Sequence, residues 1–475
     1  MYSTVKFVIK PNDELYEYCD KATNAANNLK NATLFRVRQV LTMFSKEEKD
    51  WSTNEKEIYK ELKYYLPQMG AKYTMPCKGK TFLSYQFLNA LMVKSKNPDY
   101  INNNISRHGA QHVLKEVSRD MKSFYALLRM YKKDPKSLPG KPNLPKYCKK
   151  GGNHTVKLSN QEVKIYDVPG KTDCHYIHLP LTKIKYSVKA TPIKGRLKEA
   201  SIVPYHNVFG LILVLDDGKA MPEKKDISRI CAIDMGINNF AAITNNIGVP
   251  SLLFKGGIIK SINQYCNKRM RKIRSVQTAG TTNKFKMTDK AHKVCLKRNN
   301  QIADFMSKIA NKIVNWCVQN NIDTIVIGKN TGWKTETNLG KVNNQNFVQI
   351  PFNNFVSQIK YRADDHGISV IEQEESYTSK ASFLSKDPIP VYEPDSAKSY
   401  VFSGKRVKRG LYKEKDGTII NADLNGSANI LRKAFQAAFD FTRPEFDDVY
   451  IYVHPDLKPI HKSNPSGIRL VNSRC

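Results

Sequence analysis

The sequence contains no pair of cysteines at C-x-x-C spacing and no hydrophobic run long enough to cross a bilayer. Its nine cysteines stand apart from one another, which is typical of reduced thiols and argues against a cysteine-ligated zinc site. A membrane helix needs about 20 consecutive apolar residues, and no segment approaches that length. Because no N-terminal signal sequence is visible either, we expect a cytoplasmic protein with no structural zinc and no membrane contact.

Acidic residues are scarce relative to basic ones. The chain has 77 Lys and Arg residues against 43 Asp and Glu residues, which leaves a formal net charge of +34. This excess is spread along the whole chain, and phosphate-backbone binding is its usual cause because each neutralised phosphate releases counterions. A ribosomal-type or membrane-surface protein is the alternative, but no long basic amphipathic helix or lipid-anchor motif occurs. The charge therefore predicts a nucleic-acid partner.

The pattern of apolar residues divides the chain into β-rich and helical regions. Residues 2–10 alternate apolar and polar side chains, as a strand does, and short β-like runs return at 153–216. Helical spacing fills the interval between them, and strands alternate with helices after residue 226. We therefore predict a multidomain α/β fold with a small barrel or sandwich. The expected parts are the barrel or sandwich at 1–11 and 134–225, a helical lobe at 12–133, an α/β domain at 226–379 and 411–445, a basic insert at 380–410, and a tail at 446–475.

Two aspartates of the α/β region are candidate catalytic residues. An apolar strand runs into Asp234 and then Gly236, which places a carboxylate on a central strand. Asp423 lies in the first turn of a predicted helix, whose small residues 426–428 would let it approach a sheet closely. Each has an ordinary alternative, because Asp234 could form a turn and Asp423 could interact with the helix dipole. Their occurrence in one region favours a shared site.

A third carboxylate is needed if the two aspartates hold metal ions. Two divalent ions about 3.5–4 Å apart require several anionic oxygens during phosphodiester hydrolysis. The buried strand at 324–328 is the expected source, but it ends in Gly328. The following strand ends in glutamates, and a Glu there could reach over the bare glycine; a solvated acidic rim is the alternative. In order of preference the candidates are Glu375, Glu374 and Glu372.

Two dense basic clusters are candidate nucleic-acid contacts. The first carries five basic residues within seven positions, on a predicted helix where Met270 and Ile273 supply an apolar anchor. The second lies in the basic insert. Tyr85 and Gln86, on a helix of the N-terminal lobe, are a further and weaker candidate contact. The clusters consist of Lys268, Arg269, Arg271, Lys272 and Arg274, and of Lys405, Arg406, Lys408 and Arg409.

Four ordered blocks together resemble the TnpB family of transposon-encoded RNA-guided nucleases, which are relatives of compact type V CRISPR effectors and of Fanzor proteins. Clear resemblance covers about residues 225–435, and the segments KSFY and PGKP further upstream are similar more weakly. One block alone would be a modest signal, whereas four in order are specific. The blocks are AIDMGINN (232–239), VIGKNTGWK (326–334), ESYTSK (375–380) and NADLNGSANI (421–430).

The resemblance implies a RuvC-like nuclease domain of the RNase H fold, in which Asp234, Glu375 and Asp423 hold two Mg²⁺ ions. It also implies a wedge-like β-barrel that holds a guide RNA and an inserted helical recognition lobe. In such systems base pairing reads most of the target, while the protein reads shape and a short adjacent motif. The implied function is RNA-guided cleavage of double-stranded DNA, in the prokaryotic cytoplasm and at the nucleoid when the protein is bound to DNA.

The chain departs from the common family pattern in two places. Many members carry the middle glutamate on the strand that here ends in Gly328, so this sequence resembles a subgroup with a relocated glutamate. Members also often carry a four-cysteine zinc insert before the last aspartate. The interval 380–410 has no cysteine here, which suggests a metal-free basic insert that contacts target nucleic acid.

Two other functions stay open. An RNA-guided DNA-binding repressor that has lost cleavage would explain Gly328 but not Glu375. A DNA-joining transposase of the same broad superfamily would recognise transposon ends without a guide RNA.

Overall fold

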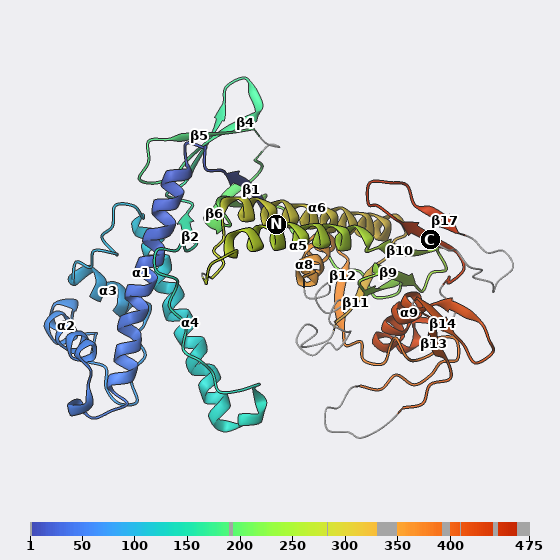
Figure 1. Ribbon diagram of the computed structural model, residues 1–475, viewed down its shortest axis with the longest axis horizontal. Coiled ribbons are helices and arrows are strands. Elements are labelled where there is room, and N and C mark those ends of the chain that lie inside the picture. The colour runs from blue at the N-terminus through green and yellow to red at the C-terminus, as the bar shows by residue number, and fades with distance from the viewer. Residues whose placement is uncertain are drawn as a thin grey trace. The chain divides into compact units, whose positions relative to one another are not determined.

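The protein is described here by a computed structural model that covers residues 2–189, 193–282, 284–329, 349–391, 400–408, 410–439 and 445–462. The chain divides into two units, Met1–Lys219 and Ala220–Cys475. Each unit combines helices and sheets around cores of its own (Figure 1). The predicted multidomain α/β fold is therefore confirmed. Within the described ranges, every helix is too short or too polar to be a membrane span.

The helices of the first unit follow β1 and precede its other strands, so the predicted helical block is present. Three of them begin at a serine whose hydroxyl accepts a backbone N–H of the first turn, namely Ser52, Ser84 and Ser106. Such caps satisfy donors that have no partner inside a helix. The helices are α1 (Tyr16–Met43), η1 (Glu48–Asp50), α2 (Thr53–Met69), α3 (Tyr85–Lys94), α4 (Arg107–Lys133) and η2 (Pro135–Ser137).

The strands of the first unit form two antiparallel sheets. One has the order β1-β7-β6-β2, and the other has the order β3-β4-β5. The first strand pairs with β7, so it belongs to the same sheet as strands that follow the helical block. The strands are β1 (Tyr2–Ile9), β2 (Val156–Ser159), β3 (Lys164–Val168), β4 (Lys171–His178), β5 (Lys185–Lys189), β6 (Arg196–Tyr205) and β7 (Val208–Asp216).

The described strands of this unit do not close into a barrel. Both sheets stay open, yet Ile177 of β4 and Val188 of β5 share one hydrophobic core with Ile202 of β6 and Leu211 of β7. The arrangement is therefore closer to the sandwich alternative than to the predicted wedge-like barrel. Alternating side chains predict that strands form, but closure depends on edge pairing that no local pattern specifies.

The second unit is built on a seven-stranded sheet with the order β12-β11-β8-β9-β10-β16-β17. β11 runs parallel to both β8 and β12, which confirms that the Gly328 strand lies beside the Asp234 strand and is flanked by the strand that precedes the glutamates. The strands of this sheet are β8 (Ile230–Met235), β9 (Asn239–Asn245), β10 (Ser251–Lys255), β11 (Thr324–Gly328), β12 (Ser369–Gln373), β16 (Val449–Tyr452) and β17 (Ile460–Lys462).

Helices cover both faces of this sheet. α6 and α8 pack on one face and α9 on the other, while α5 lies along α6 (Figure 1). A small three-stranded sheet, β13-β14-β15, precedes α9. These elements are α5 (Gly257–Thr278), α6 (Asp289–Gln319), α8 (Phe352–Asp364), β13 (Lys405–Lys408), β14 (Leu411–Lys413), β15 (Ile419–Asn421), α9 (Ala422–Ala434) and η3 (Gln436–Phe439).

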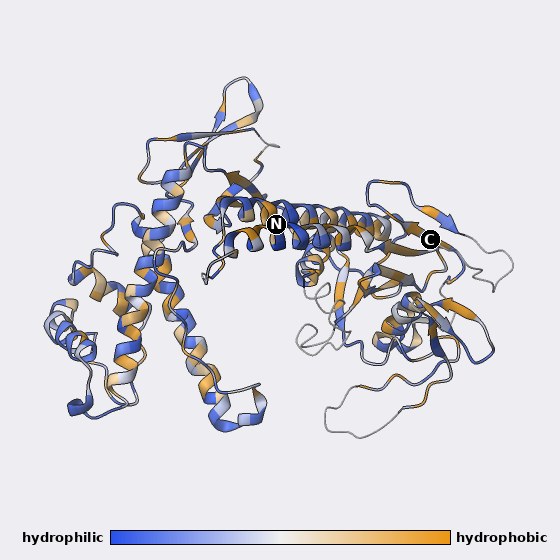
Figure 2. Ribbon diagram, viewed as in Figure 1, coloured by the Kyte–Doolittle hydropathy of each residue, from blue (hydrophilic) through white to orange (hydrophobic). Residues whose placement is uncertain are grey.

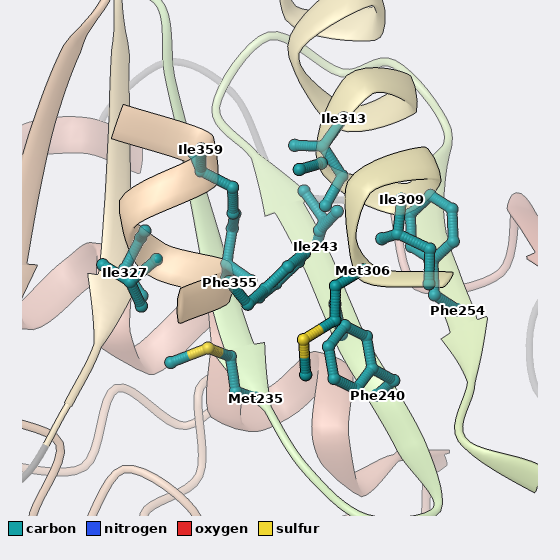
Figure 3. Packing of buried hydrophobic residues seen from close by; sticks show 14 of the residues in the cluster. Met235, Phe240, Ile243, Phe254, Met306, Ile309, Ile313, Ile327, Phe355 and Ile359 are labelled. Atoms are coloured by element: carbon teal, nitrogen blue, oxygen red, sulfur yellow. The ribbon is translucent and has the colours of Figure 1, made fainter. Parts of the chain in front are cut away.

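The two faces of β8 point into different cores, because side chains alternate along a strand. Met235 belongs to the large core shared with α6 and α8, where its side chain lies among those of the helices (Figure 3). Ala232 belongs to a second core that contains Ile430 of α9. Asp234 shares the face of Ala232, so the alternation directs the aspartate toward α9.

Two predicted boundaries differ from the structure. Residues after 446 were expected to form a tail, but β16 pairs in parallel with β10 and extends the central sheet. The basic insert was expected to end at residue 410, whereas β13 of the insert pairs with β14 beyond it. β16 and β13 have four residues each and β14 has three. Alternation over so few residues is too short to be recognised as a strand from the sequence pattern alone.

The carboxylate of Asp323, directly before β11, ties the start of that strand to the start of β8. Its buried side chain accepts bonds from the backbone N–H groups of Ser228 and Arg229 at 3.0 and 2.6 Å. We expect Asp323→Ala to lower the free energy of unfolding by about 3 kcal/mol, because buried donors lose a charged acceptor. Urea denaturation measures this. The exposed Asp365→Ala control should change it by less than about 0.5 kcal/mol, and equal losses would contradict the assignment.

Candidate active site

Asp234 lies near the end of β8 with its carboxylate against α9. Its Oδ2 atom is 2.7 Å from the point that a Cβ on Gly426 would occupy. A side-chain carbon does not approach an oxygen this closely, so any larger residue would push the helix or the carboxylate away. The bare backbone at Gly426 is therefore what allows helix and carboxylate to meet.

Ser427, the next residue of α9, fastens the helix to the sheet. Its hydroxyl donates to the carbonyl oxygen of Ala232 at 2.8 Å and accepts the backbone N–H of Thr244 at 3.1 Å. All three residues are buried, so the hydroxyl supplies hydrogen bonds that water cannot. The predicted role of the small residues 426–428, which was to allow close approach to a sheet, is confirmed.

Glu375 lies just beyond β12, and its carboxylate occupies the space over Gly328. The register of the parallel pair places Gly328 opposite Gln373. Oε2 of Glu375 is 2.6 Å from the point that a Cβ on Gly328 would take, and Cδ1 of Ile430 is 2.5 Å from the same point. The missing side chain on β11 thus makes room for a carboxylate from the neighbouring strand. This is the reach across Gly328 that the sequence predicted.

The two alternative glutamates have other partners. Glu372 forms ion pairs with Lys329 and Lys360 at 2.6 Å each, and the hydrogen bonds of these pairs lower its pKa. Burial of Glu374 opposes ionisation, but its bond to Lys433 contributes to a net lowering of its pKa. Both are therefore held as ionised partners of lysines, away from the space over the bare glycine.

Asp423 stands in the first turn of α9, as predicted. The side chain of Asn421 caps the helix by accepting the backbone N–H of Asp423 at 2.9 Å. One carboxylate oxygen of Asp423 accepts a hydrogen bond from Asn239 at 2.7 Å, and the other accepts from the guanidinium of Arg406 at 2.9 Å. Arg406 was predicted to contact nucleic acid, and the structure places it on a candidate catalytic carboxylate.

Asn239 and Lys255 are site residues that the sequence analysis missed. Asn239 is buried at the start of β9, where it donates to Asp423 and accepts from the ammonium of Lys255 at 3.0 Å. Burial lowers the pKa of Lys255, while the nearby Asp423 charge acts in the opposite direction. The signal for Asn239 was available, because it ends the AIDMGINN block. No sequence signal marks Lys255 as a site residue. It reaches Asn239 only because β10 pairs antiparallel with β9 in the folded protein.

The three carboxylates influence one another electrostatically. Burial raises the pKa of Asp234 well above its ordinary value, the charges of Glu375 and Asp423 raise it further, and Arg406 opposes them. Oxygen ligands of this kind suit Mg²⁺, and a divalent cation would relieve their repulsion. Among the residues that the structure describes, no three acidic, His or Cys side chains already surround one metal position. The donor chemistry of the three carboxylates therefore fits Mg²⁺.

The predicted basic contacts lie outside this cluster of carboxylates, with the exception of Arg406. The five residues of the first cluster are exposed on α5, and Lys405 and Lys408 are exposed on β13. Arg409 lies outside the described residues. In the other unit, Gln86 is exposed, while Tyr85 packs against the core and lies under the ammonium of Lys115.

Two family models match the chain. Residues 212–334 match the OrfB_IS605 family, described as a probable transposase. Residues 352–430 match the TNB domain of Cas12f1-like proteins. The first match contains Asp234 and Gly328, and the second contains Glu375 and Asp423. The chain is TnpB-like.

Solved structures of RNA-guided effectors are similar to this TnpB-like chain at low identity. A Cas12f1–sgRNA–target DNA complex has 11% identity and a TM-score of 0.49, covering 88% of this chain and 82% of that one. CasPhi-2 (Cas12j) bound to crRNA and phosphorothioate-DNA has 9% identity, a TM-score of 0.36 and coverages of 92% and 91%. C2c1 of Alicyclobacillus acidoterrestris with single-guide RNA has 10% identity, a TM-score of 0.29 and coverages of 86% and 70%. Curated proteins yielded no match.

The two glycines that admit the carboxylates can be tested by adding one methyl group. Gly328→Ala and Gly426→Ala should each lower the free energy of unfolding by about 1–3 kcal/mol, because the new Cβ would clash with Glu375 or Asp234. For Gly426 the clash has to outweigh the better helix propensity of alanine. Gly257→Ala is the matched control, since a Cβ there meets nothing within 4 Å. Equal stability of all three variants would contradict the close approach.

The raised pKa of Asp234 predicts a gain of stability when its charge is removed. The folded state binds a proton at Asp234 more tightly than the unfolded chain, so stability falls as the pH rises above the ordinary Asp range. In a chelator at neutral pH, Asp234→Asn should therefore raise the free energy of unfolding by about 1–2 kcal/mol. The gain should disappear in acid, where the native carboxyl is protonated. A destabilised variant at neutral pH would contradict the repulsion.

Proposed function

We propose that this TnpB-like protein is an RNA-guided DNA endonuclease in which Asp234, Glu375 and Asp423 hold two Mg²⁺ ions. The observation that carries the proposal is the position of Glu375 over Gly328, on the same side of the sheet as Asp234. An inactive site would lack a carboxylate over Gly328. The glutamate that occupies this space therefore favours an active nuclease over an inactive one. The match of residues 352–430 to a TNB domain supports a target nucleic acid as substrate.

The partners of the proposed enzyme are a guide RNA and double-stranded target DNA. The net charge of +34 and the exposed cluster on α5 supply the positive surface that two phosphate backbones require. Two of the similar solved structures are complexes of those proteins with an sgRNA or a crRNA and with DNA. By analogy, base pairing would select the target, and the first unit would contact the guide RNA and the short motif beside the target.

Each residue of the site has a defined task in phosphodiester hydrolysis. Bound Mg²⁺ would activate the attacking water and stabilise the charge that develops on the phosphate. Asp234 supplies anionic oxygens from β8, Glu375 supplies them from just beyond β12 on the other side of β11, and Asp423 supplies them from α9. Asn239 orients Asp423 by donating to one of its oxygens. Arg406, whose guanidinium already lies at the site, would exchange its bond with Asp423 for a phosphate oxygen of the DNA.

A DNA-joining transposase is the second candidate, because the matched OrfB_IS605 family is described as a probable transposase. Such an enzyme also needs a carboxylate cluster, so the site geometry does not separate the two. They differ in the requirement for RNA. A repressor without cleavage is the third reading, and it is opposed by the position of Glu375.

The three glutamates after β11 allow a matched test of the site. The purified protein with its copurified RNA should cut a guide-matched plasmid in Mg²⁺, and Glu375→Gln should reduce the rate at least about 100-fold, because an anionic oxygen is lost where charge develops. Glu372→Gln should cut at nearly the wild-type rate, since Glu372 pairs with Lys329 and Lys360. Glu374→Gln tests the remaining alternative ligand.

The outcomes separate the candidate functions. Tight binding of the matched plasmid without cutting by the wild type would leave the repressor. Absence of a discrete copurified RNA, together with joining of transposon ends, would establish the transposase. Loss of cutting in Glu374→Gln but not in Glu375→Gln would move the middle ligand to Glu374.

A further inference from the structure

The helical pair α5 and α6 carries a hollow that the proposed nuclease site does not use. Its volume is about 240 Å³, which is smaller than the roughly 300–1,000 Å³ of pockets for drug-sized ligands. One face of each helix lines it, at spacings of three and four residues, as neighbours on a helix surface must be. The hollow therefore has room for one small group rather than for a large cofactor. We call it the α5–α6 pocket.

The walls of the α5–α6 pocket are positive and contain no acidic residue. Five of its ten lining residues are basic, and four of these are exposed at its rim. Both helices show interspersed hydrophilic and hydrophobic residues along their length (Figure 2). The five basic residues are Arg269 on α5 and Lys290, Lys293, Lys297 and Arg298 on α6.

Hydrogen bonds to neutral groups hold Arg298 in the lining of the pocket. Its guanidinium donates to the side-chain oxygens of Asn263 and Asn299 at 2.9 and 2.8 Å, and to the carbonyl oxygen of Gln349. These three acceptors are neutral, so they position the half-buried cation without cancelling its charge. Because the described hydrogen-bond acceptors of Arg298 carry no formal charge, they leave its guanidinium able to attract an anionic ligand.

An aromatic ring stands at the same place. Tyr265 lines the pocket, and 56% of its surface is exposed to solvent. The floor beside it is apolar or half-buried and includes Ile262, Cys266 and Val294. Phosphate binding alone would require neither an exposed ring nor an apolar floor. Basic residues around an accessible aromatic ring are the arrangement with which proteins hold unpaired bases and their phosphates.

We propose that the α5–α6 pocket binds one unpaired nucleotide of a single strand, with its base stacked on Tyr265 and its flanking phosphates bound by Lys293 and Lys297. A continuous duplex fits less well, because its bases are already stacked on each other and offer no free face to the ring. The strand can be RNA or DNA, since both share this chemistry. The proposal goes beyond the proposed function, because binding here requires neither metal nor cleavage.

Stacking can be measured directly with the full-length protein in a chelator, which separates the result from any failure of the nuclease proposal. Short RNA and DNA strands that carry one 2-aminopurine, a base whose fluorescence falls when it stacks on an aromatic ring, serve as probes. We expect quenching with the wild type and with Tyr265→Phe, and an affinity about 5- to 100-fold lower for Tyr265→Ala. Quenching of only the RNA or only the DNA probe identifies the source of the strand.

Lysine variants test the phosphate contacts separately. Lys293→Ala should weaken quenching and reduce the slope of log affinity against log salt by about 0.7, the value for one phosphate contact of a single strand. Tyr265→Ala should leave that slope unchanged. Lys308→Ala is the matched control, because it lies on α6 outside the pocket and is already paired with Asp304 and Asp456. Quenching that does not depend on Tyr265, or an equal effect of Lys293→Ala and Lys308→Ala, would overturn the proposal.

Discussion

Close packing of α9 against β8, where the bare backbone of Gly426 meets the carboxylate of Asp234, is the contact on which the rest of the site depends. The helix brings Asp423 to the sheet and Ile430 over Gly328, while the hydroxyl of Ser427 replaces water at the backbone of the strand. Two bare glycines, one on the helix and one on β11, leave two spaces, and a carboxylate occupies each. A larger residue at either position would displace the carboxylate that occupies the space or the element that carries it.

The cost of this arrangement is electrostatic. Asp234 is partly buried beside two other carboxylates, so its pKa rises and the metal-free protein carries repulsion between these carboxylates. The surrounding groups reduce that repulsion in different ways, because Arg406 forms an ion pair with Asp423 and Asn239 donates a hydrogen bond to it. Sites that perform chemistry commonly retain such unfavourable local charge at the expense of stability. The same feature makes the cluster suitable for cations.

The positive surfaces differ from one another in what they can bind. Lys405 and Lys408 on β13 are exposed charges suited to a phosphate backbone, and so is most of the cluster on α5. The α5–α6 pocket adds depth, an exposed ring at Tyr265 and a fixed cation at Arg298. Charge alone attracts any strand, whereas a hollow with a ring distinguishes an unpaired nucleotide from a continuous duplex.

Local patterns were sufficient to predict the strand β11 beside β8, the helix whose first turn contains Asp423 and the excess of positive charge, because each follows from short-range periodicity or composition. They did not predict β16 and β17 in the sheet, the open sheets of the first unit, or Asn239 at the site. The sequence by itself indicated that a glutamate after the strand 369–373 could reach over Gly328, and it favoured Glu375 among three candidates. Only the tertiary structure decided their places, because the register of β12 against β11 and the positions of Lys360 and Lys433 direct the other two glutamates away.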